Sequence, residues 1–332
     1  MELIHANSEM IEQGVVTDFK KFDCQIKGDS EPTNNTFELM MPIQAWKADK
    51  ILSGHFLYID GTEFGGLVRS VKKDTRTHSI TIGGLTWRGL LANKIIVPPS
   101  GSAYLVFTSE TPSNIIRSVV GTFYKGIYAV EDAVDMPSIS CQFRYQTVLY
   151  GLSNVFSKSG LSLSIRFDAT QGKCILKPRR IVDYSSLYDV SEDLGVNLTI
   201  KTGGTIVYNH VIALGRGELE ERDVVERWLY NGTIYSSRPS GMYENEEQTA
   251  VYDYPSVESI TELENGAEEY LRKYQDTTTI DVDVSNVVDI DMLLDDTITV
   301  LDRDMDVNVV KRVVQKVLTI TGQYEKVETE VS

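Results

Sequence analysis

Gly84 and Gly89 stand five residues apart in the stretch GGLTWRGLL, directly after an alternating run of apolar and polar residues. A phosphate-binding loop has two glycines at this spacing between a strand and a helix, followed by Lys and then Ser or Thr. The lysine contacts the outer phosphates and the hydroxyl binds the metal. This chain has Leu90 and Leu91 in those two places. The stretch therefore predicts a strand end, a tight turn and one short helical turn held by leucines.

An aspartate-rich segment, residues 281–306, is the richest group of potential metal ligands. A calcium loop of the EF-hand type that began at Asp281 would need glycine in sixth place and glutamate in twelfth, where the chain has Asn286 and Met292. Asp281 and Asp283 alternate with Val282 and its apolar neighbours, which predicts a strand with one solvated face. The acids of the segment are Asp281, Asp283, Asp289, Asp291, Asp295, Asp296, Asp302, Asp304 and Asp306.

Other catalytic patterns are weak. The four histidines are widely spread, and no G-x-S-x-G nucleophile motif is present. A glycoside hydrolase needs only two carboxylates, and 48 acidic residues always supply candidates. We therefore predict a protein that is not an enzyme, with no cofactor and no metal, and keep a cell-wall hydrolase as an alternative.

The composition restricts the partners. The chain has 332 residues, with 48 acidic and 32 basic side chains and a formal net charge of −16. Nucleic-acid binders and proteins of anionic membrane surfaces normally carry a basic patch, so both classes are disfavoured. Cys24, Cys141 and Cys174 are far apart and odd in number, which predicts free thiols in a reducing cytosol. We expect no signal peptide and no membrane span.

Strands and helices alternate in blocks along the chain. Alternation over residues 15–43 predicts a hairpin with a polar turn, and three more short strands are predicted at 51–60, 65–72 and 78–83. Thr111 before Pro112 marks a helix start, and Gly160 ends a second helix. Strands are expected at 161–167, 172–178, 196–204 and 205–215, and residues 218–249 read as an exposed loop. Ser259 and Glu262 form a capping box for a third helix, and the remaining chain is β again.

Read in order, these segments resemble the baseplate hub or tail-tip proteins of siphophages. The opening hairpin contains Phe37-Glu38-Leu39. In the family, a pattern of the type G-I … I … V-x-G … L-L … R-I-I-x-P follows. The corresponding residues of this chain are 66–68, 80–83, Leu90-Leu91 and 94–98. The "VIALGRGE" strand and turn, the capped helix and the closing β segment then come in the family's order. The family favours Gly-Asp before a final strand, where this chain has Asp295-Asp296; Asp tolerates a left-handed backbone better than most residues do.

The resemblance implies an α+β, mainly β fold, similar to the central baseplate hub of contractile tails. We expect two small β-barrel-like domains, at 1–103 and 196–332, with an α/β domain at 104–195 between them and a helix near 260–274. Three copies would form a ring, which closed symmetry makes natural. The expected partners are itself, the tail tube and distal tail proteins, and tail-tip or receptor-binding proteins.

The predicted function is a structural component of a phage or prophage tail tip, a hub ring that surrounds the DNA exit channel and is assembled in the bacterial cytoplasm. A carbohydrate-binding adhesin is a further alternative. Carboxylates repel the DNA backbone over about 8–10 Å at physiological salt, so an acidic lumen would let the genome pass. The candidate channel-lining residues are Asp281, Asp283, Asp289, Asp291, Asp295 and Asp296.

Overall fold

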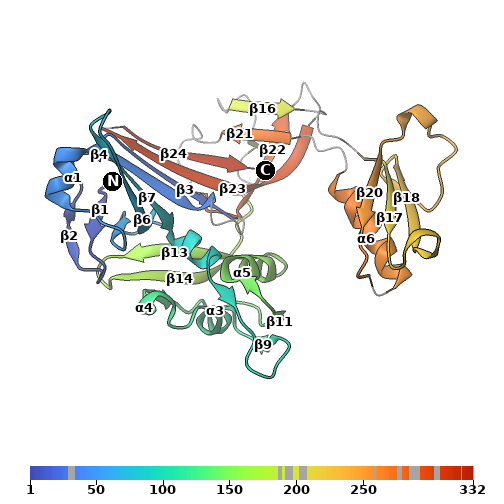
Figure 1. Cartoon of the computed structure of the whole chain (residues 1–332), viewed down its shortest axis with the longest axis horizontal. Helices are drawn as coiled ribbons and strands as arrows, with labels where there is room; N and C mark the ends of the chain where they lie inside the picture. The colour runs from blue at the N-terminus through green and yellow to red at the C-terminus, as the bar shows by residue number, and fades with distance from the viewer. Residues whose placement is uncertain are drawn as a thin grey trace. The chain divides into compact units, whose positions relative to one another are not determined.

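The described chain is mainly β-structure with a few short helices, which confirms the predicted fold class (Figure 1). This computed structural model describes residues 1–28, 34–185, 189–190, 197–201, 208–257, 259–274, 279–283, 292–302, 307–322 and 324–331. None of the helices in these ranges is long and apolar enough to cross a membrane.

One large sheet joins the two ends of the sequence. Its strands are β1 (Ile4–Ala6), β2 (Glu12–Val15), β3 (Lys21–Lys27), β4 (Thr36–Pro42), β5 (Phe56–Tyr58), β6 (Gly65–Asp74), β7 (Ser79–Thr86), β15 (Asp189–Val190), β16 (Asn197–Lys201), β21 (Thr279–Asp283), β22 (Thr297–Asp302), β23 (Val307–Thr321) and β24 (Tyr324–Val331). The main order is β16-β21-β24-β23-β3-β4-β7-β6-β5-β1-β2, with β22 beside β23 and β15 beside β22. No closed barrel is seen among these described strands.

The predicted N-terminal hairpin is confirmed as the antiparallel pair β3 and β4. Phe22, Cys24 and Ile26 alternate on its buried face. Asp74 accepts hydrogen bonds from the main-chain N–H groups of Arg76 and Thr77, which closes the turn between β6 and β7.

The two glycines of the opening stretch serve close packing. Gly84 lies in β7, where a Cβ atom would come within 2.2 Å of the Phe37 ring. Helix α2 (Trp87–Ala92) begins directly afterwards, and Thr86 caps it by accepting a hydrogen bond from the N–H of Gly89 at 3.1 Å. All six residues of α2 are buried. The predicted strand end and short helix are therefore confirmed, whereas the predicted tight turn between them was wrong, because Thr86 both ends β7 and caps α2.

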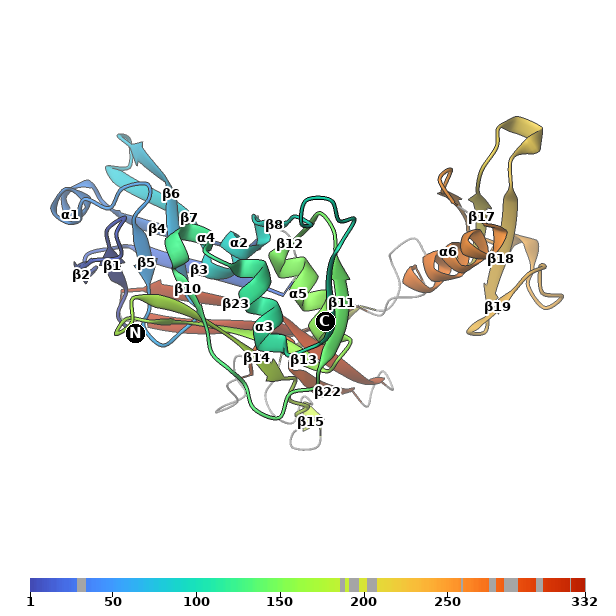
Figure 2. The same cartoon turned by 90° about the horizontal axis from the view of Figure 1, so that it is seen from below.

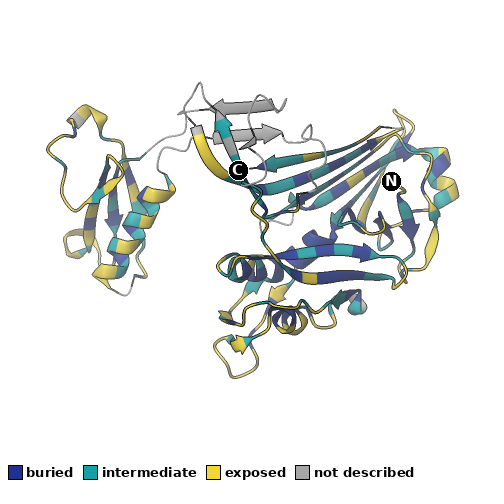
Figure 3. Cartoon of the chain, turned by 180° about the vertical axis from the view of Figure 1, so that it is seen from behind, coloured by how far each residue is buried: buried dark blue, intermediate teal, exposed yellow. Residues whose placement is uncertain are grey.

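The middle of the chain packs on the same core as the first strands. Helices α3 (Pro112–Val120) and α5 (Val148–Ser157) begin at Thr111 and Thr147, whose hydroxyls cap them. They pack against the hairpin of β13 (Leu161–Asp168) and β14 (Lys173–Arg180), as Figure 2 shows. Figure 3 shows the burial along this hairpin. The smaller elements of the region are β8 (Ile95–Ile96), β9 (Leu105–Glu110), α4 (Phe123–Gly126), β10 (Tyr128–Val130), β11 (Ile139–Phe143) and β12 (Gln146–Thr147); α1 (Ile43–Asp49) follows β4.

The chain divides into two compact units, which differ from the three predicted segments. Unit 1 is Met1–Leu198 with Asp281–Ser332, and unit 2 is Thr199–Ile280. The predicted segments 1–103 and 104–195 share unit 1 and one hydrophobic core, and the predicted segment 196–332 is split between the units. The reason is long-range pairing, because β23 joins β3 across almost the whole sequence. The barrel-like shape of two domains stays a prediction.

The described part of unit 2 contains a four-stranded sheet, one α-helix and two short 3-10 helices at Leu219–Glu221 and Glu244–Glu246. The sheet has the order β19 (Thr233–Tyr235), β18 (Val224–Tyr230), β17 (His210–Leu214) and β20 (Thr249–Asp253). Ser259 accepts from the N–H of Glu262 at the start of α6 (Ile260–Lys273), which confirms the predicted cap. The prediction of an exposed loop over 218–249 was wrong, because β18 buries Val225 and Trp228 within that range.

Candidate functional site

The six predicted channel-lining aspartates fall into three groups. Asp281 and Asp283 lie in β21, where Asp283 is opposite Glu330 of β24. Asp289 and Asp291 lie outside the described residues. Asp295 and Asp296 form the turn that enters β22, and the structure gives both of them partners within unit 1.

Asp296 is buried, with 1% of its surface exposed. Its Oδ1 atom accepts hydrogen bonds from Arg179 Nη1 at 2.6 Å and from the N–H of Val182 at 2.9 Å. Its Oδ2 atom accepts from the N–H of Leu293 at 2.8 Å. The carboxylate therefore ties β14, the segment after it and the entry to β22 together.

Asp295 has the left-handed backbone that the sequence predicted, with φ of 75°. Its Oδ2 atom accepts a hydrogen bond from Ser162 Oγ at 2.6 Å, and Arg312 Nε lies 3.4 Å from Oδ1. These contacts connect the turn to β13 on one side and to β23 on the other.

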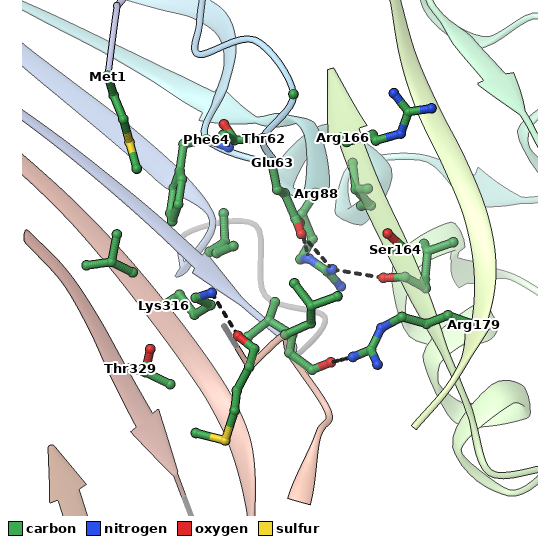
Figure 4. A pocket seen from close by; sticks show the side chains of 18 residues that line it. Met1, Thr62, Glu63, Phe64, Arg88, Ser164, Arg166, Arg179, Lys316 and Thr329 are labelled. Atoms are coloured by element: carbon green, nitrogen blue, oxygen red, sulfur yellow. Dashed lines mark hydrogen bonds and ion pairs between the residues drawn. The ribbon is translucent and has the colours of Figure 1, made fainter. Parts of the chain in front are cut away.

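Next to this turn lies a partly open cavity of about 370 Å³, lined by residues of unit 1 (Figure 4). The walls come from the N-terminal strands and the loop before β6, from the β13–β14 hairpin, and from residues near β22, β23 and β24. The cavity is lined by Met1, Ile26, Gly61, Thr62, Glu63, Phe64, Arg88, Leu163, Ser164, Ile165, Arg166, Arg179, Met292, Leu293, Leu294, Lys316, Val327 and Thr329. Half of these side chains are apolar, four are basic and one is acidic.

Arg88 and Glu63 form a buried two-point ion pair in the wall of the cavity. Arg88 Nε lies 2.6 Å from Glu63 Oε1, and Arg88 Nη2 lies 3.2 Å from Oε2 and donates as well to the carbonyl of Leu163. Burial is the largest single influence and lowers the pKa of the guanidinium, but the charge and hydrogen bonds of Glu63, together with the charge of Asp295 and the neighbouring Cys174, raise the pKa of Arg88 overall. Arg88 Nη1 has no hydrogen-bond acceptor among the described residues.

Two further basic groups are partly fixed by carbonyl oxygens. Lys316, 8% exposed, donates from Nζ to the carbonyl of Met292 at 2.8 Å. Arg179 donates to the carbonyl of Leu294 as well as to Asp296. Figure 4 shows Arg88 and Arg179 reaching toward the same part of the cavity, whereas Arg166 points away from Arg88.

The structure also brings together two histidines that the sequence left apart. His5 Nε2 and His55 Nδ1 are 2.8 Å from each other, and the rings are stacked. Burial, and then the neighbouring His55, lower the pKa of His5 to about 4. Among the described residues no group of three His, Cys, Asp or Glu side chains is placed to bind a metal ion.

One residue of the cavity wall, Arg88, could have been recognised from the sequence, but the sequence analysis did not single it out. Arg88 interrupts the apolar stretch of α2, and a buried arginine requires a paired acid. Its partner Glu63 lies 25 residues earlier, and Arg179 and Asp296 are 117 residues apart. No spacing rule links residues at such distances in the chain.

No protein-family model matches the chain, and no curated protein matches it in sequence. Solved structures do match its fold. The 43 kDa tail protein of prophage MuSo2 from Shewanella oneidensis aligns over 100% of this chain and 98% of its own, at 13% identity and a TM-score of 0.54. A tail protein from Neisseria meningitidis MC58 aligns over 99% of this chain and 95% of its own, at 10% identity and a TM-score of 0.53. The predicted resemblance to phage tail proteins is thus confirmed at the level of the fold.

Proposed function

We propose that this chain is a structural protein of a phage or prophage tail, built into the tail tip or baseplate. The observation that carries the proposal is the fold match over the full length of a prophage tail protein. Because the match runs from end to end in both chains, it covers the large sheet as well as unit 2 and is not limited to one common motif. Fold likeness alone does not assign function, so an experiment has to test the role.

The finer part of the proposal is a hub ring of three copies that joins the tail tube to the distal tip. A ring of identical chains closes through a heterologous contact between two different surfaces of each copy. The partners are then the chain itself, the tube and distal tail proteins, and the tip or receptor-binding proteins. The role is mechanical, with assembly in the bacterial cytoplasm and a final location at the virion tail tip.

The proposal includes an acidic DNA channel. The net charge of −16 supplies carboxylates that repel a passing phosphate backbone. Of the six candidates, Asp296 is already engaged with Arg179, and Asp295 with Ser162 and Arg312. The proposal places Asp281 and Asp283, which lie in β21, at the lumen.

The direct test is to remove the gene from the phage or prophage that encodes it. We expect particles without tails or with tails that lack a tip in electron micrographs, and restoration when the gene is supplied in trans. Antibody against an epitope tag should label the end of the tail distal to the head. Infectious virions without the protein, or label along the whole tube, would contradict the proposal. Incubation of the purified chain with cell walls should release no sugar or peptide.

A further inference from the structure

The cavity beside α2 is lined by more basic than acidic side chains. Its lining contains four of the 32 basic residues of the chain and only one of the 48 acidic residues. A typical stretch of the surface of a chain with net charge −16 carries more acidic than basic side chains. Of the four basic side chains, Arg88 and Lys316 are buried and Arg179 is largely so, with 14% of its side chain exposed. Arg88 is paired with Glu63 and Arg179 with Asp296, and Lys316 donates to the carbonyl of Met292, so the three basic groups are held in place at the wall of a partly sheltered space.

The buried guanidinium of Arg88 is a second indication of a ligand-binding site. The residue is 1% exposed and lines the cavity, yet its Nη1 atom has no acceptor among the described residues. A buried donor without an acceptor is costly, and a charged donor more so than a neutral one. A ligand oxygen placed beside it would remove that penalty.

The walls define the rest of the ligand. Half of the lining side chains are apolar, among them Phe64, Leu163 and Leu294. An inorganic anion would leave these walls in contact with water. An anion with an aliphatic body would cover them, and one oxygen of its carboxylate would accept the charge-assisted hydrogen bond that Arg88 Nη1 lacks. A volume of about 370 Å³ is within the range of pockets that hold small organic ligands.

We propose that this cavity binds a carboxylate carried by an aliphatic body, with the carboxylate beside Arg88 and the body against Phe64, Leu163 and Leu294. The carboxylate comes from a free small acid or from the acidic side chain or C-terminus of a neighbouring protein. The site does not depend on the proposed tail role, since it rests on contacts within unit 1 alone.

Calorimetric titration of the full chain tests the site with three probes: 4-methylpentanoate, its neutral amide and inorganic phosphate. We expect saturable binding of 4-methylpentanoate and at least tenfold weaker binding of the amide and of phosphate. No binding of the carboxylate, equal binding of the amide, or preference for phosphate would each overturn the proposal. A tetrapeptide ending in a leucine carboxylate, compared with its C-terminal amide, separates the sources: tighter binding than 4-methylpentanoate indicates a protein ligand, and weaker binding indicates a free acid.

Two variants separate binding from folding. The double variant Arg88→Met with Glu63→Gln removes both members of the ion pair, so that no lone charge stays buried, and should weaken binding at least tenfold. Ser164→Phe keeps every charge and fills the space, and should abolish binding. Arg117→Gln is the matched control, because this exposed arginine does not line the cavity and its loss should change the affinity less than about threefold. Unchanged affinity in Ser164→Phe would place the ligand elsewhere and refute the inference.

Discussion

Replacing Asp296 with alanine tests whether the turn before β22 holds unit 1 together. The change removes the acceptor of Arg179 and of the N–H groups of Val182 and Leu293. Loss of one partner from a buried ion pair destabilises a protein by about 3–5 kcal/mol. Each main-chain donor left without an acceptor adds about 1 kcal/mol or more, and water that enters the space offsets part of it. We expect unit 1 to lose about 4 kcal/mol, roughly a thousandfold in its folding equilibrium.

Urea unfolding followed by tryptophan fluorescence measures this loss. Both proteins should carry Trp228→Phe, so that Trp46 and Trp87, which lie in unit 1, report on that unit alone. Separate reporting is needed because two units need not unfold in one transition.

The control is a pair of the same chemistry on the surface. Arg117 and Asp132 form an ion pair whose side chains are 40% and 76% exposed, and exposed pairs contribute about 1 kcal/mol or less. Asp132→Ala should therefore change the free energy of unfolding by less than about 1 kcal/mol. A loss in Asp296→Ala as small as in the control would refute the reasoning. The double variant Arg179→Met with Asp296→Leu leaves no lone buried charge, so it should be more stable than Asp296→Ala. A double variant that is less stable than Asp296→Ala would also refute the reasoning.

Three further predictions concern single features of the fold. Gly84→Ala should destabilise unit 1 by about 3 kcal/mol or more, since its Cβ would clash with β4, whereas Gly28→Ala, with 3.5 Å of clearance, should change stability by less than about 1 kcal/mol in the same urea assay. The folded-state pKa of His5 is lowered from 6.5 to about 4, so its contribution to stability is present above pH 6.5 and lost as the pH falls toward 4; His5→Gln should flatten that part of the stability–pH curve, and an unchanged curve would show that the pair has no such effect. Ellman's reagent should label Cys141 first in the native protein and the two buried cysteines only on unfolding, because burial raises the pKa of both buried thiols well above the usual value; equal labelling rates would contradict this.

Helices with a cap and a periodic face could be predicted from the sequence because both signals are local. Thr111 and Ser259 lie directly before the helices that they cap. The alternation through Phe22 and Cys24 likewise predicted one buried face of β3. The strand β18 was missed, because glutamate and arginine between its apolar residues made the segment read as polar overall. Its apolar positions do alternate in part, and a shorter window would have found them.

The aspartate-rich segment shows why the candidate site could be predicted only in part. Asp283 alternates with Val282 along β21, a pattern that a strand with one polar face produces from local rules alone. Asp295 and Asp296 belong to the same aspartate-rich segment, and nothing in the local sequence distinguishes them from the other aspartates of that segment. What distinguishes them is Ser162 and Arg179, which lie 133 and 117 residues earlier in the chain. Pairing of the β13–β14 hairpin brings both partners to the turn, so the roles of these two acids follow from the fold and not from the run in which they stand.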